Sequence, residues 1–191
     1  MKSKLFIATL AAALLAASGF GILQWATTAR ARAAAHALAE TSRWFPAAQS
    51  AARLMIDRYG PPQEASIFEL RWNNTAPWKR IVVQDDPRSP LVDVVRFRVP
   101  ADKLADIHRL GHGVSIDTFE DEISARGDRE ELNMLSLNLA DDVVAGRMTP
   151  DEANRFYARL LELRESGKSS PYTERLLFSP PSNPYRDFPI R

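Results

Sequence analysis

A run of uncharged residues rich in alanine and leucine, at positions 5–29, divides this chain into two parts. Because Lys2 and Lys4 precede the run, it has the order of a secretory signal peptide, a short basic segment followed by an apolar one. The stretch 5–25 is also long enough to span a bilayer as a helix. We therefore expect residues 1–33 to be a signal peptide or a membrane anchor. Either one exports the remainder, to the periplasm or to the outer side of the inner membrane.

The remaining residues, roughly 155 in number, suffice for one domain with its own core. Residues 1–33 hold four of the 25 Lys and Arg residues and none of the 24 Asp and Glu residues, so the remainder is mildly acidic. That balance gives no electrostatic reason to expect a nucleic-acid partner. The chain has no cysteine, which excludes a thiol nucleophile, a cysteine zinc site and an iron–sulfur cluster. We find no cofactor motif.

Helical periodicity marks the start of this domain. Apolar residues at helical spacing predict a helix that begins at Pro46 and ends at Gly60, where Pro61 prevents its continuation. The alanine- and arginine-rich residues 34–45 before it are expected to form a linker or a helical spacer.

Alternating apolar and charged side chains predict strands in the middle of the chain. Residues 66–84 have the pattern of a β-hairpin whose alternate side chains, from Phe68 onward, face the core. Residues 95–99 predict a third strand. Residues 114–123 predict a fourth, in which the alternation shifts phase near Phe119, so that a bulge or an early end is also consistent with the pattern.

The C-terminal part is expected to be a helical hairpin followed by a tail. Asp128 and Glu131 have the spacing of a capping box, and Thr149 and Glu152 form a second such pair. Residues 168–191 are rich in proline and predict an extended segment.

Together these elements predict an α+β domain over residues 46–167. It would contain about four antiparallel strands, an N-terminal helix, one inserted helix at 100–110, and the helical hairpin covering one face of the sheet.

Two tryptophans are the first candidate site. Trp72 and Trp78 flank the turn-forming residues 73–77. Exposed indoles beside a tight loop would form a platform for a sugar or a peptide. The alternative is a cross-strand aromatic pair that closes the hairpin from within.

A basic patch is the second candidate site. The outward face of the sheet is expected to hold four basic side chains, Arg71, Lys79, Arg96 and Arg98. Such a patch would bind an acidic partner or phosphate groups. Glu69 and Asp93 could equally neutralise it across the strands.

Two histidines are the candidates for a metal site. His108 and His112 are four residues apart, a spacing that puts two imidazoles on one helix face. Gly111 is expected to end the helix and turn His112 away, so that capping or surface roles are the alternative. The acidic residues 117–122 could do acid–base work nearby or form a solvated face. No nucleophile elbow or glycine-rich phosphate loop accompanies them.

Two local patterns resemble known families. The sequence Tyr59-Gly60-Pro61-Pro62, followed by Trp-Asn-Asn-Thr-Ala-Pro-Trp-Lys-Arg at 72–80, resembles a family of uncharacterised exported bacterial proteins over residues 50–160. Residues 52–83 are also similar to the small envelope assembly lipoproteins of the SmpA/OmlA type, which run from a helix through Gly-x-Pro into a hairpin. This chain lacks their lipidated cysteine. The resemblance implies an interaction module of the envelope and no activity.

We therefore expect a non-enzymatic envelope domain that binds a protein or cell-wall partner through the Trp72–Trp78 hairpin or the outward sheet face. The alternative is a metal-dependent or hydrolytic enzyme that uses His108 or His112 with nearby carboxylates.

Overall fold

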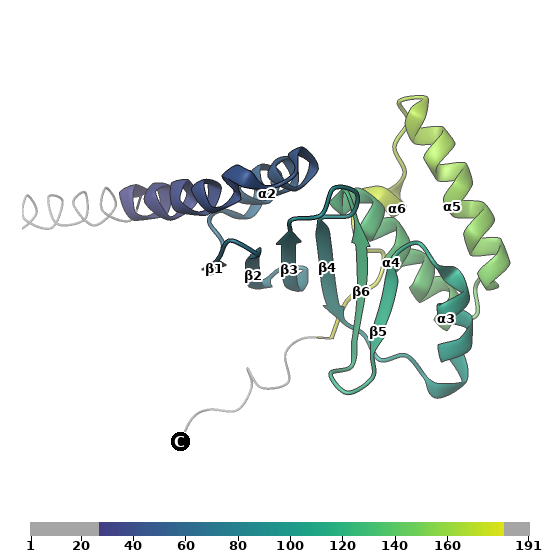
Figure 1. The fold of residues 1–191 in the computed structure, drawn as a ribbon. Helices are drawn as coiled ribbons and strands as arrows, with labels where there is room; N and C mark the ends of the chain where they lie inside the picture. Colours follow the sequence, from purple (N-terminus) through teal and green to yellow (C-terminus); the bar gives the residue numbers. More distant parts are fainter. Residues whose placement is uncertain (1–26, 182–191) are drawn as a thin grey trace, which may run out of the picture.

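The computed structural model describes residues 27–181, which form an α+β protein built on one antiparallel sheet (Figure 1). The apolar stretch 5–25, predicted to be a signal-peptide core or an anchor, lies outside the described residues. Within residues 27–181, no helix is long and apolar enough to cross a membrane.

The sheet has six strands rather than the expected four. They are β1 (Glu64–Ala65), β2 (Glu69–Thr75), β3 (Trp78–Gln84), β4 (Leu91–Arg96), β5 (Val114–Asp117) and β6 (Glu122–Gly127). Their order across the sheet is β1-β2-β3-β4-β6-β5, and every neighbouring pair is antiparallel. The helical elements are η1 (Thr41–Arg43), α2 (Pro46–Tyr59), η2 (Ala101–Lys103), α3 (Leu104–Leu110), α4 (Glu130–Val144), α5 (Pro150–Glu165) and α6 (Pro171–Glu174), and residues 27–40 are also helical.

A side-chain-stabilised turn splits the predicted strand 114–123 in two. The Oδ1 atom of Asp117 accepts hydrogen bonds from the backbone N–H groups of Phe119 and Glu120, at 2.9 and 3.1 Å. The chain therefore reverses at this point and forms the β5–β6 hairpin. Because β6 pairs with β4, β5 becomes an edge strand.

A similar turn joins β1 to β2. The Oγ atom of Ser66 accepts hydrogen bonds from the backbone N–H groups of Phe68 and Glu69, at 3.2 and 3.1 Å. Phe68 therefore lies in the turn and is 75% exposed, so the prediction that it faces the core is wrong. The alternation begins at Leu70, which is fully buried.

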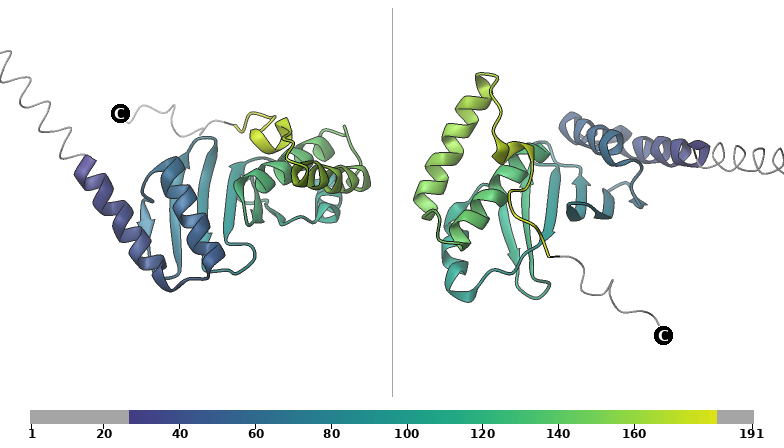
Figure 2. Two further views of the ribbon diagram at one scale, coloured as in Figure 1. Left: turned by 90° about the horizontal axis from the view of Figure 1, so that it is seen from above. Right: turned by 180° about the vertical axis from the view of Figure 1, so that it is seen from behind.

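One core joins the helices to one face of the sheet. The strands contribute alternate residues to it, namely Leu70, Trp72, Ile81, Val83, Leu91, Val95, Ile123 and Ala125. Helix α2 packs against β3, and α4 packs against β4 and β6 (Figure 2). The other alternate residues of the strands point to the opposite face of the sheet.

Residues 34–45, expected to be a linker or a helical spacer, pack against the domain. Ala37, in the helical segment 27–40, is fully buried, and Trp44 is 5% exposed. The indole N–H of Trp44 donates a hydrogen bond to the carbonyl oxygen of Ile67 at 2.8 Å. This segment therefore belongs to the domain.

The first part of the predicted tail also belongs to the domain. The side-chain amide of Asn138 on α4 donates hydrogen bonds to the carbonyl oxygens of Tyr172 and Arg175, at 3.0 and 2.8 Å. The ring of Phe178 packs edge-on against Phe97, with centroids 5.2 Å apart. The predicted domain boundary at residue 167 is therefore too early, because the chain continues to pack against α4 and the sheet.

The two predicted helix caps have different outcomes. At α5, Thr149 and Glu152 form the expected capping box. At α4, the residue before the helix is Arg129, which makes no side-chain cap, so the box predicted from Asp128 and Glu131 does not form. The first residue of α4, Glu130, is instead held by long-range contacts.

Candidate functional site

Both candidate tryptophans are buried. Trp72 is fully buried and donates its indole N–H to the carbonyl oxygen of Gly60 at 2.9 Å. Trp78 is 2% exposed and donates to Oε1 of Glu130 at 2.7 Å. The indoles do not pair across the hairpin, since Trp72 lies opposite Ile81. The prediction of an exposed aromatic platform is therefore wrong, and both residues are part of the core.

Glu130 is the centre of a buried polar cluster. Only 2% of this residue is exposed, and its carboxylate accepts hydrogen bonds from Arg58, Tyr59 and Trp78. Burial, together with the bond to Glu130, raises the pKa of Tyr59. The cluster joins α2, β3 and α4, so its role in the described structure is to hold these elements together.

A second buried acid lies on the core side of the sheet. Asp93 on β4 is fully buried, and its Oδ2 atom accepts a hydrogen bond from the Asn133 side-chain amide at 2.8 Å. Its Oδ1 atom has no hydrogen-bond partner among the described residues. Burial raises the pKa of Asp93 well above its usual range, and nearby Glu130 raises it further. Asp93 therefore cannot neutralise the basic side chains of the outward sheet face, and the prediction that it could do so is wrong.

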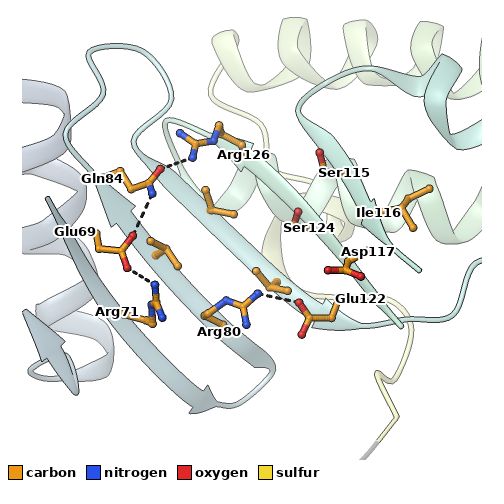
Figure 3. Close-up of a pocket in the computed structure, with 13 residues that line it drawn as sticks. Glu69, Arg71, Arg80, Gln84, Ser115, Ile116, Asp117, Glu122, Ser124 and Arg126 are labelled. Carbon is orange, nitrogen blue, oxygen red and sulfur yellow. Dashed lines mark hydrogen bonds and ion pairs between the residues drawn. The ribbon is translucent and has the colours of Figure 1, made fainter. Parts of the chain in front are cut away.

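The face of the sheet opposite α2 and α4, which no helix of residues 27–181 covers, is called the uncovered face and carries a hollow of about 320 Å³ (Figure 3). We call it the sheet-face hollow, and it is lined by Glu69, Arg71, Arg80, Val82, Gln84, Val92, Val94, Ser115, Ile116, Asp117, Glu122, Ser124 and Arg126. All of these residues come from strands β2 to β6, and none comes from a helix. Valines occupy the central strands β3 and β4, while charged side chains extend over them.

Four of the six charged side chains around the sheet-face hollow form ion pairs, whereas Arg126 and Asp117 bond to uncharged groups. Arg80 bonds to Glu122 at 2.8 Å, and Arg71 bonds to Glu69. Gln84 links Glu69 to Arg126 by a hydrogen bond to each (Figure 3). With three arginines and three acids in its lining, the hollow presents both signs of charge rather than a basic patch.

Three of the four residues predicted to form the basic patch lie outside the hollow. Lys79 pairs with Glu122 and with Glu120, the latter at 3.2 Å. Arg96 is half-buried at the end of β4, and the side chain of Arg98 is 84% exposed. Only Arg71 lines the hollow. A binding role for Arg96 and Arg98 stays a prediction.

The two histidines have different surroundings. His108 is exposed on α3, which ends at Leu110. Gly111 and His112 have φ values of 64° and 50°, so the chain turns after the helix as predicted. The His112 ring then stacks on Tyr157, with centroids 3.8 Å apart, and burial lowers the pKa of His112. Within residues 27–181, no group of three His, Cys, Asp or Glu side chains could hold a metal ion.

Sequence reasoning missed one exposed residue. Phe119, at the tip of the β5–β6 hairpin, is 99% exposed. The signal available in the sequence was an aromatic residue flanked by acidic residues at the point where the strand alternation fails.

Comparisons with known proteins identify no relative. No protein family, no curated protein and no solved structure matches the chain. The family resemblance and the likeness to envelope lipoproteins therefore stay predictions.

Proposed function

We propose that this chain is a non-enzymatic domain of the cell envelope that binds an envelope protein or a cell-wall component through the uncovered face of its sheet. The observation that carries the proposal is the sheet-face hollow, which five neighbouring strands form without any helix residue. The basic and apolar N-terminal segment, residues 1–33, supports export of the domain.

The chemistry of the hollow indicates what it would bind. Val92 and Val94 offer an apolar floor, and Arg80 and Glu122 offer opposite charges within one ion pair. A ligand with a single charge gains little at Arg80 or Glu122, because it would break this pair in order to bind one half of it. A polypeptide segment, or the peptide part of a cell wall, supplies both charges together with apolar groups and is the better match.

In-cell cross-linking tests this proposal. A photo-reactive residue at Ser115, which is exposed on β5 and lines the hollow, is expected to cross-link one envelope protein or peptidoglycan. The same residue at Glu162, on the exposed surface of α5, serves as the control position.

Binding of the purified product, or sedimentation with purified peptidoglycan, is then measured for two variants. Ser124→Arg fills the hollow and is expected to abolish binding, whereas Ser124→Ala leaves the hollow open and is expected to retain it. Equal binding by both variants, or equal cross-linking from both positions, would exclude this face as the binding surface.

A further inference from the structure

The tip of the β5–β6 hairpin presents an apolar side chain from an ordered backbone turn. Phe119 is the most exposed of the large apolar side chains in residues 27–181. Asp117 bonds to the backbone of Phe119 and Glu120, and the carbonyl oxygen of Asp121 accepts a hydrogen bond from the Phe97 N–H at 2.7 Å. An aromatic residue whose backbone is already ordered loses less conformational entropy when it binds, which suits an interface anchor.

Acidic side chains surround this phenylalanine. Asp117, Glu120 and Asp121 are all exposed. The contacts of Glu120 with Lys79 at 3.2 Å and of Asp121 with Arg98 at 3.9 Å are surface ion pairs, which are weak. Acidic groups beside the ring disfavour insertion into an anionic membrane, which attracts basic segments. They favour an apolar pocket with a basic rim.

A hollow of that kind lies on α5 of the same chain. It has a volume of about 280 Å³, and we call it the α5 hollow; it is lined by Met148 and Phe156 and by Arg147, Glu152, Arg155 and Arg159. Arg147 is already paired with Asp141 and Asp142. Within the described part of the chain, Arg155 and Arg159 have no ion-pair partner within 4.0 Å. Arg155 lies near enough to Glu152 to help lower the pKa of that carboxyl, so Arg159 is the less engaged of the two cations.

We propose that Phe119 of one molecule inserts into the α5 hollow of a second copy of this chain. The ring would meet Met148 and Phe156, while the acids beside it would face Arg155 and Arg159. Because the hairpin and the hollow are different surfaces, the contact is head-to-tail, and each molecule keeps one free hairpin or hollow for a further copy. Of the residues named for this contact, only Asp117 also lines the sheet-face hollow.

Sedimentation velocity of the purified full chain tests the self-association. The apparent mass is expected to rise with protein concentration and to fall with added salt, which screens the charged rim. Phe119→Ser is expected to raise the dissociation constant about tenfold or more. Arg155→Glu is expected to weaken association as well. Phe68→Ser, which removes another exposed phenylalanine, is the matched control and is expected to change nothing.

Cysteine cross-linking tests the predicted contact directly, because the chain has no cysteine of its own. A Thr118→Cys protein, which keeps Phe119, mixed with a longer-tagged Ala158→Cys protein, which keeps Arg155 and Arg159, is expected to form the mixed disulfide dimer, because both new cysteines are exposed neighbours of the contact residues. A Thr118→Cys and Leu54→Cys mixture is the control, since Leu54 is an exposed residue of α2.

Two results would overturn the proposal. One is a mass independent of concentration, together with mixed-dimer yields equal to the control. The other is binding of Phe119 to vesicles of phosphatidylglycerol and phosphatidylethanolamine that Phe119→Ser abolishes while the protein remains monomeric. Either result would leave the sheet-face proposal intact.

Discussion

Replacing Glu130 by alanine is expected to lower the free energy of unfolding by about 1–3 kcal/mol. The substitution removes the nearer of two acceptors of the buried Trp78 N–H, the other being the Tyr59 hydroxyl oxygen at 3.1 Å, so it costs about one hydrogen bond, or about 0.5–1.5 kcal/mol. The lost bond from the half-buried Tyr59 hydroxyl adds about 0.5–1.5 kcal/mol. Arg58 contributes little, because its side chain is 49% exposed and can turn to water.

Urea unfolding followed by tryptophan fluorescence measures this loss, with the slope of the transition checked for each variant. Glu131→Ala is the matched control, because Glu131 neighbours Glu130 on α4 but its side chain is 45% exposed. Glu130→Gln keeps an acceptor for Trp78 and is expected to cost less than Glu130→Ala. If Glu130→Ala were as stable as Glu131→Ala, the cost of burying the carboxylate would equal its hydrogen bonds, and the assigned stabilising role would be wrong.

Three further substitutions test other parts of the fold. Burial raises the pKa of Asp93 in the folded state, so the free energy of unfolding is expected to fall as pH rises from about 4 towards that raised pKa. Asp93→Asn should remove this pH dependence, which urea unfolding at several pH values measures. Thr149→Ala is expected to cost about 1 kcal/mol in thermal unfolding through loss of the α5 cap. Asn138→Ala should release the segment around Tyr172, detected as faster proteolysis there while the rest of the domain stays resistant.

Local sequence could predict those structural features that depend on contacts between residues close together in the chain. The antiparallel α+β class followed from alternation and helical periodicity. The α5 start followed from Thr149 and Glu152, whose contacts span three residues. The presence of six strands could not be predicted from the alternation. It depends on two turns in which the side chains of Ser66 and Asp117 accept the hydrogen bonds of backbone N–H groups.

The burial of Trp78 illustrates what local sequence cannot supply. Its N–H bonds to Glu130 and to Tyr59, which are 52 and 19 positions away, so no pattern in the hairpin itself distinguishes a buried indole from an exposed one. The partners of Glu130 are equally far along the chain, since its carboxylate binds residues of α2 and β3. The capping box predicted from Asp128 and Glu131 failed for a different reason, because α4 begins one residue later, at Glu130.

Asp117 links the two surfaces for which we propose partners. It lines the sheet-face hollow, and it also holds the turn that presents Phe119. Changing Asp117 would therefore disturb both surfaces at once. The sheet-face hollow would lose a charge, and the turn that presents Phe119 would lose the hydrogen bonds that order it. Ser124 lies in the hollow away from the turn, and Phe119 lies at the tip and does not line the hollow. Partner binding and self-association can consequently be lost separately, so each proposal can fail without the other.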